Sequence, residues 1–280
     1  MMTIEQLLNT GADTLRKAGV EEYRLDAWYL LSYYMNIGKN EYYKNPKAPV
    51  SDTQSAEYER LISERAKRKP LQYITREQEF AGLIFNVDEN VLIPRQDTEV
   101  IAELVIQYAK SKRVLDMCTG SGCIAVSVAR YSEALSVTAS DVSERAISIA
   151  KKNAALNNAD VEFIISDLWE GIGGKYDILV ANPPYITSSE MSELMPEVFD
   201  YEPHLALCGG DDGLVFYRKI LKDINHKITD GGMVFFEIGC SQADAVAELM
   251  KEQKMSDIKV EKDLAGLDRV VWGYVGGCYV

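Results

Sequence analysis

The chain has 280 residues, 47% of them hydrophobic and 26% charged, and a formal net charge of −13 at pH 7. This length allows one large domain or a large and a small one. The acidic balance argues against broad nucleic-acid binding, which depends on lysine and arginine, and no apolar run is long enough to span a membrane. We therefore expect a cytoplasmic protein with no membrane contact and no direct nucleic-acid binding.

The first seventy residues are expected to form a small helical bundle. Apolar residues recur at three-to-four spacing in residues 3–18, 21–35 and 53–69. This spacing is typical of amphipathic helices that bury one face. Pro70 is expected to end the third helix, because proline cannot continue the helical hydrogen-bond pattern.

The pattern changes after the predicted bundle. Residues 72–93 alternate apolar and polar side chains and contain aromatic and branched residues. Alternation of this kind predicts a β-hairpin. We therefore divide the chain into a helical domain at 1–70 that docks the substrate, a hairpin linker at 71–96 and a larger domain at 97–280.

From residue 97 onward, strand-like runs alternate with helical segments. Strands are expected at 113–117, 136–140, 162–166, 176–181, 233–238, 257–262 and 269–275. The intervening segments, such as 144–157, are long enough for helical crossovers. The expected fold class is therefore α/β, with a doubly wound, mostly parallel seven-stranded sheet. The connection between the last two strands is too short for a crossover, so these two strands should pair antiparallel.

The first expected strand leads into a glycine-containing loop. Ligands of such sheets bind at the carboxyl ends of the central strands. The loop residues are Cys118, Thr119, Gly120, Ser121 and Gly122. The two glycines allow the backbone to come close to a ligand at the start of the following helix. The loop fits a dinucleotide, a nucleotide or an S-adenosylmethionine site, and it also fits a tight turn without a ligand.

Acidic residues follow the next two strands. Asp141 comes about twenty residues after the glycines, where a carboxylate can accept hydrogen bonds from both ribose hydroxyls. Asp167 ends the third strand and could accept from an adenine amino group, with Leu168 or Trp169 beside the ring. A surface acid and a core aromatic are the alternative interpretation. Because all three loops fall on one sheet edge, the pattern favours an adenosine-type ligand.

The fourth strand ends in Asn182-Pro183-Pro184-Tyr185. Each proline fixes its own φ and carries no N–H, so this corner is stiff and offers mainly acceptors: the Asn182 side-chain oxygen and backbone carbonyls. A rigid turn capped by an asparagine is the simpler interpretation. Hydride transfer with a nicotinamide cofactor needs no such group, whereas a sulfonium methyl donor beside an amino acceptor does.

The chain contains few histidine and cysteine residues that could bind a metal ion or form disulfides. The chain has two histidines, and its five cysteines form no C-x-x-C pair. We expect no metal site, and we expect reduced, mostly buried thiols. The cysteines are Cys118, Cys123, Cys208, Cys240 and Cys278.

These motifs together resemble the class I S-adenosylmethionine-dependent methyltransferases, and within them the protein-glutamine methyltransferases that modify peptide chain release factors. The resemblance is carried, in the family's order, by "PLQYITREQEFAGLIFNV", "VLIPRQDTE", "VLDMCTGSGCIAVSVA", "SDLWE", "ILVANPPYI", "YEPHLALCGGDDGLVFYRKI", "GGMVFFEIGCSQ" and "DLAGLDRVV". It implies a Rossmann-like fold and S-adenosyl-L-methionine as cofactor, with S-adenosyl-L-homocysteine as product. Enzymes that methylate exocyclic amines of RNA or DNA bases share the Asn-Pro-Pro-Tyr tetrapeptide and are the alternative.

The resemblance also implies roles for residues. The cofactor would be held by Cys118, Thr119, Gly120, Ser121, Gly122, Asp141, Asp167, Leu168 and Asn182. The substrate, the glutamine of a Gly-Gly-Gln motif in a release factor, would contact Asn182, Pro183, Pro184 and Tyr185. Asn182 Oδ1 and the Pro183 carbonyl would accept the two amide N–H bonds, and Tyr185 would wall the pocket, so Asn182, Pro183 and Tyr185 are the expected catalytic residues.

Three positions depart from the family's pattern. Glycine is usual where Arg76 and Cys118 stand, and proline is usual at Gln96. Two further residues attract attention near the same edge. We expect Arg95 to form a structural salt bridge, with Asp97 or Glu99 as partner, and Glu237 is a candidate substrate contact.

Overall fold

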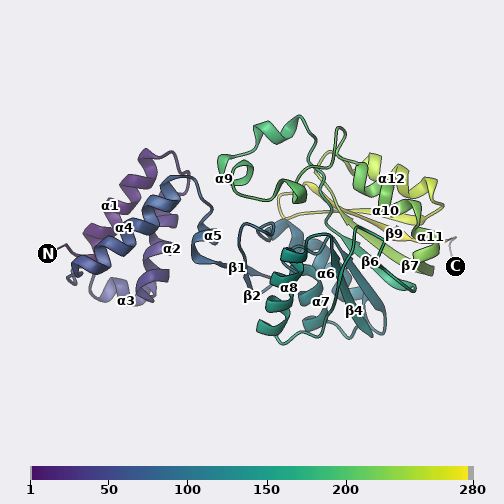
Figure 1. Cartoon of the computed structure of the whole chain (residues 1–280), viewed down its shortest axis with the longest axis horizontal. Coiled ribbons are helices and arrows are strands. Elements are labelled where there is room, and N and C mark those ends of the chain that lie inside the picture. The colour runs from purple at the N-terminus through teal and green to yellow at the C-terminus, as the bar shows by residue number, and fades with distance from the viewer. Residues whose placement is uncertain (1, 277–280) are drawn as a thin grey trace. The chain divides into compact units, whose positions relative to one another are not determined.

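The structure of the protein, a computed structural model, describes residues 2–276 (Figure 1). The chain forms two compact units. One contains the residues up to Arg76 together with Met195–Tyr201, and the other contains Glu77–Leu194 and the residues from Glu202 onward. A short segment from the second half of the chain therefore belongs to the N-terminal unit.

The N-terminal unit is helical. Its helices are α1 (Ile4–Lys17), α2 (Tyr23–Met35), α3 (Lys39–Lys44), α4 (Asp52–Ala66) and α5 (Leu71–Thr75), with α9 (Pro196–Phe199) from the later segment. The side chains of Thr3 and Ser51 cap α1 and α4, each in a reciprocal capping box with a glutamine. Leu7, Leu15 and Leu30 are among the fully buried residues of the core. The three predicted helices are confirmed, whereas α3 lacks apolar periodicity and was not expected.

The chain near Pro70 differs from the sequence-based expectation. Helix α4 ends at Ala66, before Pro70, and Pro70 instead precedes the short helix α5. Proline suits the start of a helix, because its φ is already helical and the first N–H groups need no partner. Tyr73 and Ile74 are buried in the helical unit, and this burial outweighs the strand-like alternation of the sequence. The hairpin is confined to β1 (Glu77–Phe80) and β2 (Leu83–Asn86).

The second unit is built on the predicted sheet. Its strands are β3 (Arg113–Met117), β4 (Ser136–Asp141), β5 (Glu162–Ile165), β6 (Tyr176–Ala181), β7 (Ile228–Glu237), β8 (Ser256–Lys262) and β9 (Asp268–Tyr274). Their order is β5-β4-β3-β6-β7-β9-β8, and β9 runs antiparallel to both β7 and β8. The expected fold class and the antiparallel pair are confirmed. Strand β7 begins earlier than predicted, since Gly231 and Gly232 interrupt its apolar run without ending it.

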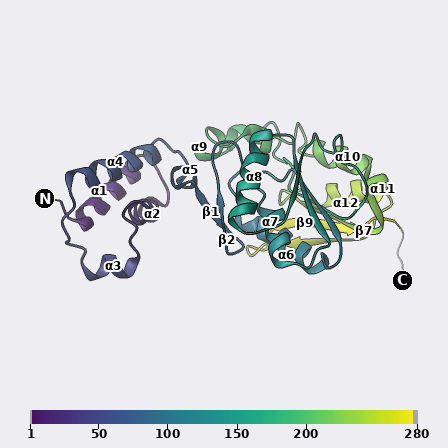
Figure 2. The same cartoon turned by 60° about the horizontal axis from the view of Figure 1, so that its bottom comes forward.

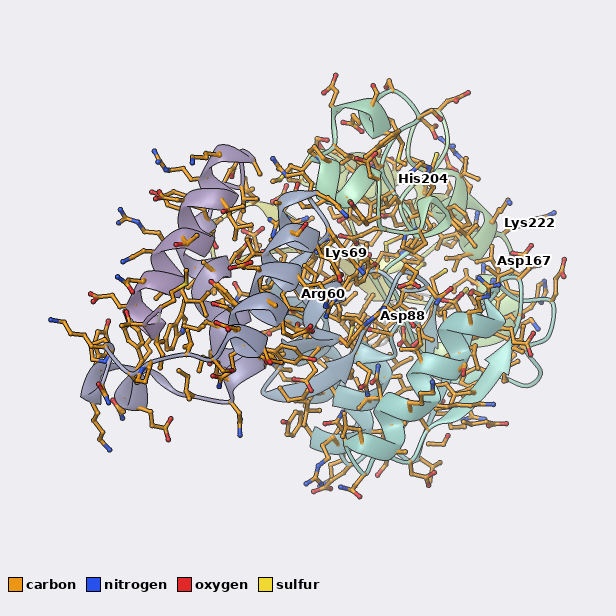
Figure 3. All side chains as sticks on the ribbon, turned by 60° about the vertical axis from the view of Figure 1, so that its left-hand side comes forward. Arg60, Lys69, Asp88, Asp167, His204 and Lys222 are labelled. Atoms are coloured by element: carbon orange, nitrogen blue, oxygen red, sulfur yellow. The ribbon has the colours of Figure 1, made fainter. Side chains whose placement is uncertain are left out.

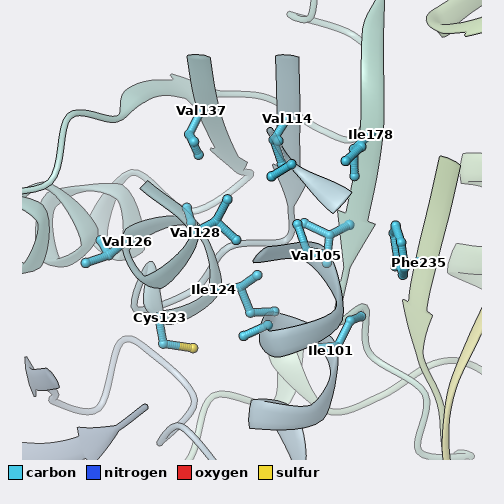
Figure 4. Close-up of a cluster of buried hydrophobic side chains, with 14 of the residues drawn as sticks. Ile101, Val105, Val114, Cys123, Ile124, Val126, Val128, Val137, Ile178 and Phe235 are labelled. Atoms are coloured by element: carbon cyan, nitrogen blue, oxygen red, sulfur yellow. The ribbon is translucent and has the colours of Figure 1, made fainter. Parts of the chain in front are cut away.

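Helices cover both faces of this sheet (Figure 1, Figure 2). One face carries α6 (Glu99–Tyr108), α7 (Cys123–Tyr131) and α8 (Glu144–Leu156), and the other carries α10 (Val215–Lys222), α11 (Ile224–Lys227) and α12 (Ala243–Glu252). Short 3-10 turns lie at Gln96–Thr98, Glu190–Glu193 and His204–Ala206. Figure 4 shows Val105 and Val128 of two helices packing toward Ile178 and Phe235 of the sheet. Strands buried on both faces explain the near-continuous apolar runs in the sequence.

The cysteines only partly follow expectation. The four that lie within residues 2–276 are free thiols, as predicted. Cys123 is buried and Cys118 and Cys208 are half-buried, but Cys240 is exposed, so the expectation of burial is wrong there. Cys240 follows the end of β7 in a polar turn, where no core is available to cover it. Cys278 lies outside the described residues.

Within residues 2–276, no helix has the length and apolarity that crossing a bilayer requires. The same part of the chain contains no cluster of three or more histidine, cysteine, aspartate or glutamate side chains arranged to hold a metal ion.

Candidate active site

A cavity that is open to solvent lies at the carboxyl ends of four neighbouring strands. From β3 the chain proceeds to β4 and β5 on one side of the sheet, whereas from β6 it proceeds to β7 on the other side. The loops after β3 and β6 therefore separate at this point and leave a crevice. The predicted residues that line it are Cys118, Thr119, Gly120, Ser121, Asp141, Asp167, Leu168, Asn182 and Pro184.

The glycine loop joins β3 to α7 and forms one wall of the cavity. Gly120 and Gly122 have φ values of 55° and 82°, in the left-handed region that favours glycine. A Cβ at Gly122 would come within 3.0 Å of the Ala150 Cβ, so this glycine lets α7 and α8 pack closely. A Cβ at Gly120 would meet nothing within 4 Å. The backbone at Gly120 thus faces open space that a ligand can fill, whereas Gly122 does not line the cavity.

Asp141 fixes the glycine loop to the end of β4. Its Oδ2 accepts the N–H of Gly120 at 2.9 Å, and its Oδ1 accepts the N–H of Ser143 at 2.9 Å. Burial raises the pKa of Asp141, and these backbone hydrogen bonds oppose that shift by favouring the carboxylate. Each carboxylate oxygen keeps a second lone pair, so Asp141 can still accept from a ligand.

Asp116, which sequence reasoning missed, supports the loop from below. It is fully buried on β3, and its Oδ2 accepts from Thr119 Oγ1 at 2.6 Å and from the Ala125 N–H at 3.1 Å. Burial raises its pKa to about 7, and the two hydrogen bonds oppose this shift. Its Oδ1 has no partner within residues 2–276. A carboxylate inside an otherwise apolar strand was the signal available in the sequence.

The charges of the cavity fit a cationic ligand. Asp141 and Asp167 line it, and Figure 3 labels Asp167 at its place on the sheet unit. Arg95 also lines it, but its guanidinium forms an ion pair with the buried Glu202. A pyrophosphate would lack a free cationic side chain among the described residues that line this cavity, whereas S-adenosylmethionine carries a net positive charge and needs none. The residues present therefore fit S-adenosylmethionine better than a dinucleotide.

Leu168 and Trp169, the two candidates for packing on an adenine ring, point to different places. Leu168 lines the cavity, with φ at 47°. Trp169 is buried in the core, and its Nε1 donates to the Ile220 carbonyl at 2.9 Å. Leu168 is therefore the one of the two that could pack beside an adenine ring, whereas Trp169 is a core aromatic residue, as the alternative interpretation proposed.

The Asn-Pro-Pro-Tyr segment is split between the cavity and the core. Asn182 and Pro184 line the cavity, while Pro183 is buried and Tyr185 does not line it. The Tyr185 ring packs against the apolar cluster between the sheet and α10–α12, and burial raises its pKa. The expectation that Tyr185 walls the pocket is therefore not met, because after two fixed prolines the chain directs this ring into the core.

The backbone that follows this segment is held by hydrogen bonds and by close packing. Ile186 donates its N–H to the Leu207 carbonyl at 3.0 Å, and its carbonyl accepts from Gly209 at 2.8 Å. A Cβ at Gly213 would lie 2.3 Å from the Tyr185 carbonyl oxygen, so this position needs glycine. Loop geometry at the cavity is thus held by contacts far away in sequence.

Gln242 at the start of α12 holds the Tyr185 carbonyl directly. Its Nε2 donates to this carbonyl at 3.0 Å, and its Oε1 accepts the Gly239 N–H at 2.9 Å. Gln242→Glu keeps the acceptor for Gly239 but removes the donor, so we expect the turnover rate to fall about tenfold, the equivalent of one hydrogen bond. Steady-state kinetics measure this, with Gln253→Glu at the other end of α12 as the charge-matched control. Equal rates for the two variants would contradict the assignment.

Other contacts at the site were not predicted. Arg95 forms the expected structural salt bridge, but its partner is Glu202 instead of Asp97 or Glu99. Asp97 pairs with Arg269, and the Glu99 carboxylate accepts the Ala81 N–H. These partners are distant in sequence, and no local pattern identifies them. Sequence reasoning also missed most of the apolar part of the lining, which includes Val91, Leu92, Pro94 and Phe216.

The fold and the cavity define a class I S-adenosylmethionine-dependent methyltransferase. The family model of the methyltransferase small domain matches residues 96–220, and that of the PrmC N-terminal domain matches residues 6–75. Among solved structures, a methyltransferase from Pyrococcus furiosus aligns with TM-score 0.56 and 18% identity over 71% of this chain and 91% of that one. A ribosomal protein L11 methylase from Lactobacillus delbrueckii subsp. bulgaricus aligns with TM-score 0.50 and 22% identity over 66% and 81%.

Curated relatives extend the match to the whole chain. A release factor glutamine methyltransferase from Clostridium acetobutylicum is 39% identical over 99% of this chain and 100% of its own length. The enzyme of that name from Geobacter sulfurreducens is 40% identical over 98% and 97%. The chain belongs to the family of release factor glutamine methyltransferases.

Proposed function

We propose that this protein transfers a methyl group from S-adenosyl-L-methionine to the side-chain amide nitrogen of the glutamine in the Gly-Gly-Gln motif of peptide chain release factors. The proposal rests mainly on the position of Asn182, which directly follows the carboxyl end of β6 and lines a cavity suited to a cationic adenosine-type ligand. The full-length similarity to release factor glutamine methyltransferases supports it. A protein, rather than a nucleic acid, is then the partner, and the reaction takes place in the cytoplasm.

The cofactor is assigned to the cavity residues. The loop residues Cys118–Ser121 would allow close backbone approach, Asp141 would accept from the ribose hydroxyls, Asp167 would accept from the adenine amino group, and Leu168 would pack beside the ring. When bound, S-adenosylmethionine supplies an electrophilic methyl group on its sulfonium. Asn182 borders the same cavity and so lies where the donor and the acceptor meet.

An amide nitrogen is a weak nucleophile because its lone pair is delocalised into the carbonyl. Asn182 Oδ1 and the Pro183 carbonyl accept its two N–H bonds, which orients the nitrogen and stabilises the positive charge that develops on it. The absence of N–H groups on Pro183 and Pro184 leaves these acceptors without a competing donor. Tyr185 anchors the segment through its half-buried ring, which packs against the apolar cluster, and through its carbonyl, which accepts from Gln242. The nitrogen loses its extra proton to water after transfer, so no strong base is needed.

The helical unit is proposed to dock the release factor. Leu25, Tyr29 and Tyr33 recur at four-residue spacing on α2 and are 40%, 50% and 49% exposed. Side chains at this spacing lie on one face of a helix, and exposed aromatic residues are common at protein interfaces. A second docking surface gives a flexible glutamine-bearing loop the affinity that the small cavity cannot supply.

Transfer from methyl-labelled S-adenosylmethionine tests the proposal. The acceptors are a whole release factor, the same factor with the Gly-Gly-Gln glutamine changed to alanine, an isolated loop peptide, and unmodified RNA and DNA. We expect label on the whole factor, none on the alanine variant, and a higher KM for the peptide. Label on nucleic acid alone would overturn the proposal in favour of a base amine, and equal KM values for peptide and factor would remove the docking role.

A further inference from the structure

Glu237, at the end of β7, lies beside Asn182 in the sheet. Ala181 pairs with Phe236 in the parallel register of β6 and β7, so the next residues on the two strands are Asn182 and Glu237. Val180 and Phe235, two residues earlier on each strand, belong to the same cluster under α6 and α7. Because side chains alternate along a strand, those of Asn182 and Glu237 are directed to this same face.

The Glu237 carboxylate is buried behind the cavity. The residue is 2% exposed and does not line the cavity, whereas Thr98 and Asn182 do. Both of these side chains are polar neighbours of the carboxylate and favour its charged form. Its Oε2 has no partner among the residues that the structure describes, so the carboxylate has spare capacity as an acceptor.

The surrounding groups do not neutralise this carboxylate by a dedicated ion pair. Arg269 on β9 lies nearby, but its guanidinium bonds Asp97 at 3.1 Å and Asp263 at 3.0 Å. Burial raises the pKa of Glu237 to about 7. Hydrogen bonding from Thr98, the charge of Arg269 and hydrogen bonding from Asn182 lower it, and the charge of Asp97 raises it. The hydroxyls of Tyr185 and Tyr217 and the thiol of Cys123 also face it.

We propose that Glu237 is a positioning residue, which accepts the side-chain N–H of Asn182 and so keeps Asn182 Oδ1 turned toward the substrate amide. The inference rests on the proposed role of Asn182. An asparagine amide presents an oxygen on one side and an NH₂ on the other, and a half-turn exchanges them. In the reversed orientation the NH₂ group of Asn182 would face the NH₂ group of the substrate glutamine, and Asn182 Oδ1 would face the Glu237 carboxylate. A fixed acceptor behind Asn182 removes this ambiguity.

Glu237→Met and Glu237→Gln separate orientation from packing. Methionine fills similar space without an acceptor, so the amide N–H of Asn182 would be left buried and unpaired, and the reversed orientation is favoured. We expect kcat to fall about 10- to 100-fold, with the Kd for S-adenosylmethionine and the melting temperature little changed. Glutamine retains a carbonyl oxygen of the same shape, so Glu237→Gln should keep most of the wild-type kcat.

The pattern across the two variants is one that a packing role would not produce. Protonated glutamate and glutamine each keep one carbonyl oxygen, so protonation of Glu237, whose pKa burial raises to about 7, should leave most of the rate, as Glu237→Gln does, whereas Glu237→Met should be slow at every pH. A Glu237→Met rate within threefold of wild type, or a Glu237→Gln variant as slow as Glu237→Met, would overturn the inference. Failure of the wild type to label a release factor would instead overturn the proposed function.

Discussion

Asn182→Ala is expected to lower kcat by about 10²–10³-fold while leaving the affinity for S-adenosylmethionine nearly unchanged. The substitution removes the side-chain acceptor that follows the carboxyl end of β6, so only the Pro183 carbonyl remains to orient the amide of the substrate glutamine. An interaction that is used to orient and stabilise the reacting nitrogen acts in the transition state, so its loss appears in kcat rather than in cofactor binding. Single-turnover methyl transfer and calorimetric titration of the cofactor measure the two quantities separately.

Asp141→Asn is the matched comparison for this prediction. Asp141 lines the same cavity, and it fixes the glycine loop through two backbone N–H groups. Asparagine has one acceptor oxygen instead of two, so the variant should bind S-adenosylmethionine more weakly and recover much of its rate at saturating cofactor. If Asn182→Ala showed the pattern expected for Asp141→Asn, Asn182 would be mainly a cofactor ligand.

The parts of the site that the sequence predicts are those set by local rules. The loop at Cys118–Gly122 and the acids Asp141 and Asp167 each follow a strand, and parallel strands bring their carboxyl ends to one edge. The partner of a charged side chain follows no such rule. Arg95 reaches Glu202 and Gln242 reaches Tyr185 because the chain folds back, and this information is absent from their neighbours in sequence.

The three departures from the family's usual residues have a backbone explanation. Arg76 and Cys118 have φ values of 65° and 62°, and Arg76 is the left-handed cap at the end of α5. Glycine adopts this conformation without steric strain, whereas an L side chain costs about 1 kcal/mol or more. Gln96 begins a 3-10 turn, a position where proline's fixed φ is favourable. The left-handed backbone at Arg76 and Cys118 and the start of the turn at Gln96 are therefore positions that suit glycine and proline better than the residues present.

Glu197→Ala is expected to destabilise the helical unit by about 3–5 kcal/mol. Glu197 lies in the segment Met195–Tyr201, and its Oε1 accepts from Arg65 at 2.9 Å while its Oε2 accepts from Arg68 at 2.6 Å. Arg65 also bonds Asp26 at 2.7 Å, with both side chains about 10% exposed or less. Removing Glu197 leaves the Arg68 guanidinium without its carboxylate and leaves Arg65 with Asp26 alone. Urea unfolding of the full chain measures the loss, and Glu197→Gln, which keeps the shape and one acceptor, should lose less.

The pH dependence of this stabilisation has a definite sign. Burial alone would raise the pKa of Glu197, but hydrogen bonding from Arg68 and Arg65 outweighs burial and lowers it below the ordinary 4.5. A carboxyl whose pKa is lower in the folded state stabilises the fold above its unfolded pKa and loses that contribution as the pH falls through the folded pKa. The difference in unfolding free energy between wild type and Glu197→Gln should therefore be full near neutral pH and shrink below about pH 4.5.

This network also decides how the docking role of the helical unit is best tested. Deleting residues 1–70 would remove Arg65 and Arg68, the two ion-pair partners of Glu197. It would also remove the Lys67 carbonyl, which accepts from the Tyr201 hydroxyl at 2.7 Å. A truncated protein would thus carry an unpaired acidic segment only ten residues after Tyr185, and loss of activity would not distinguish docking from damage near the cavity. If Glu197→Ala unfolded no more readily than wild type at neutral pH, the segment would be dispensable to the helical unit and truncation would become an informative experiment.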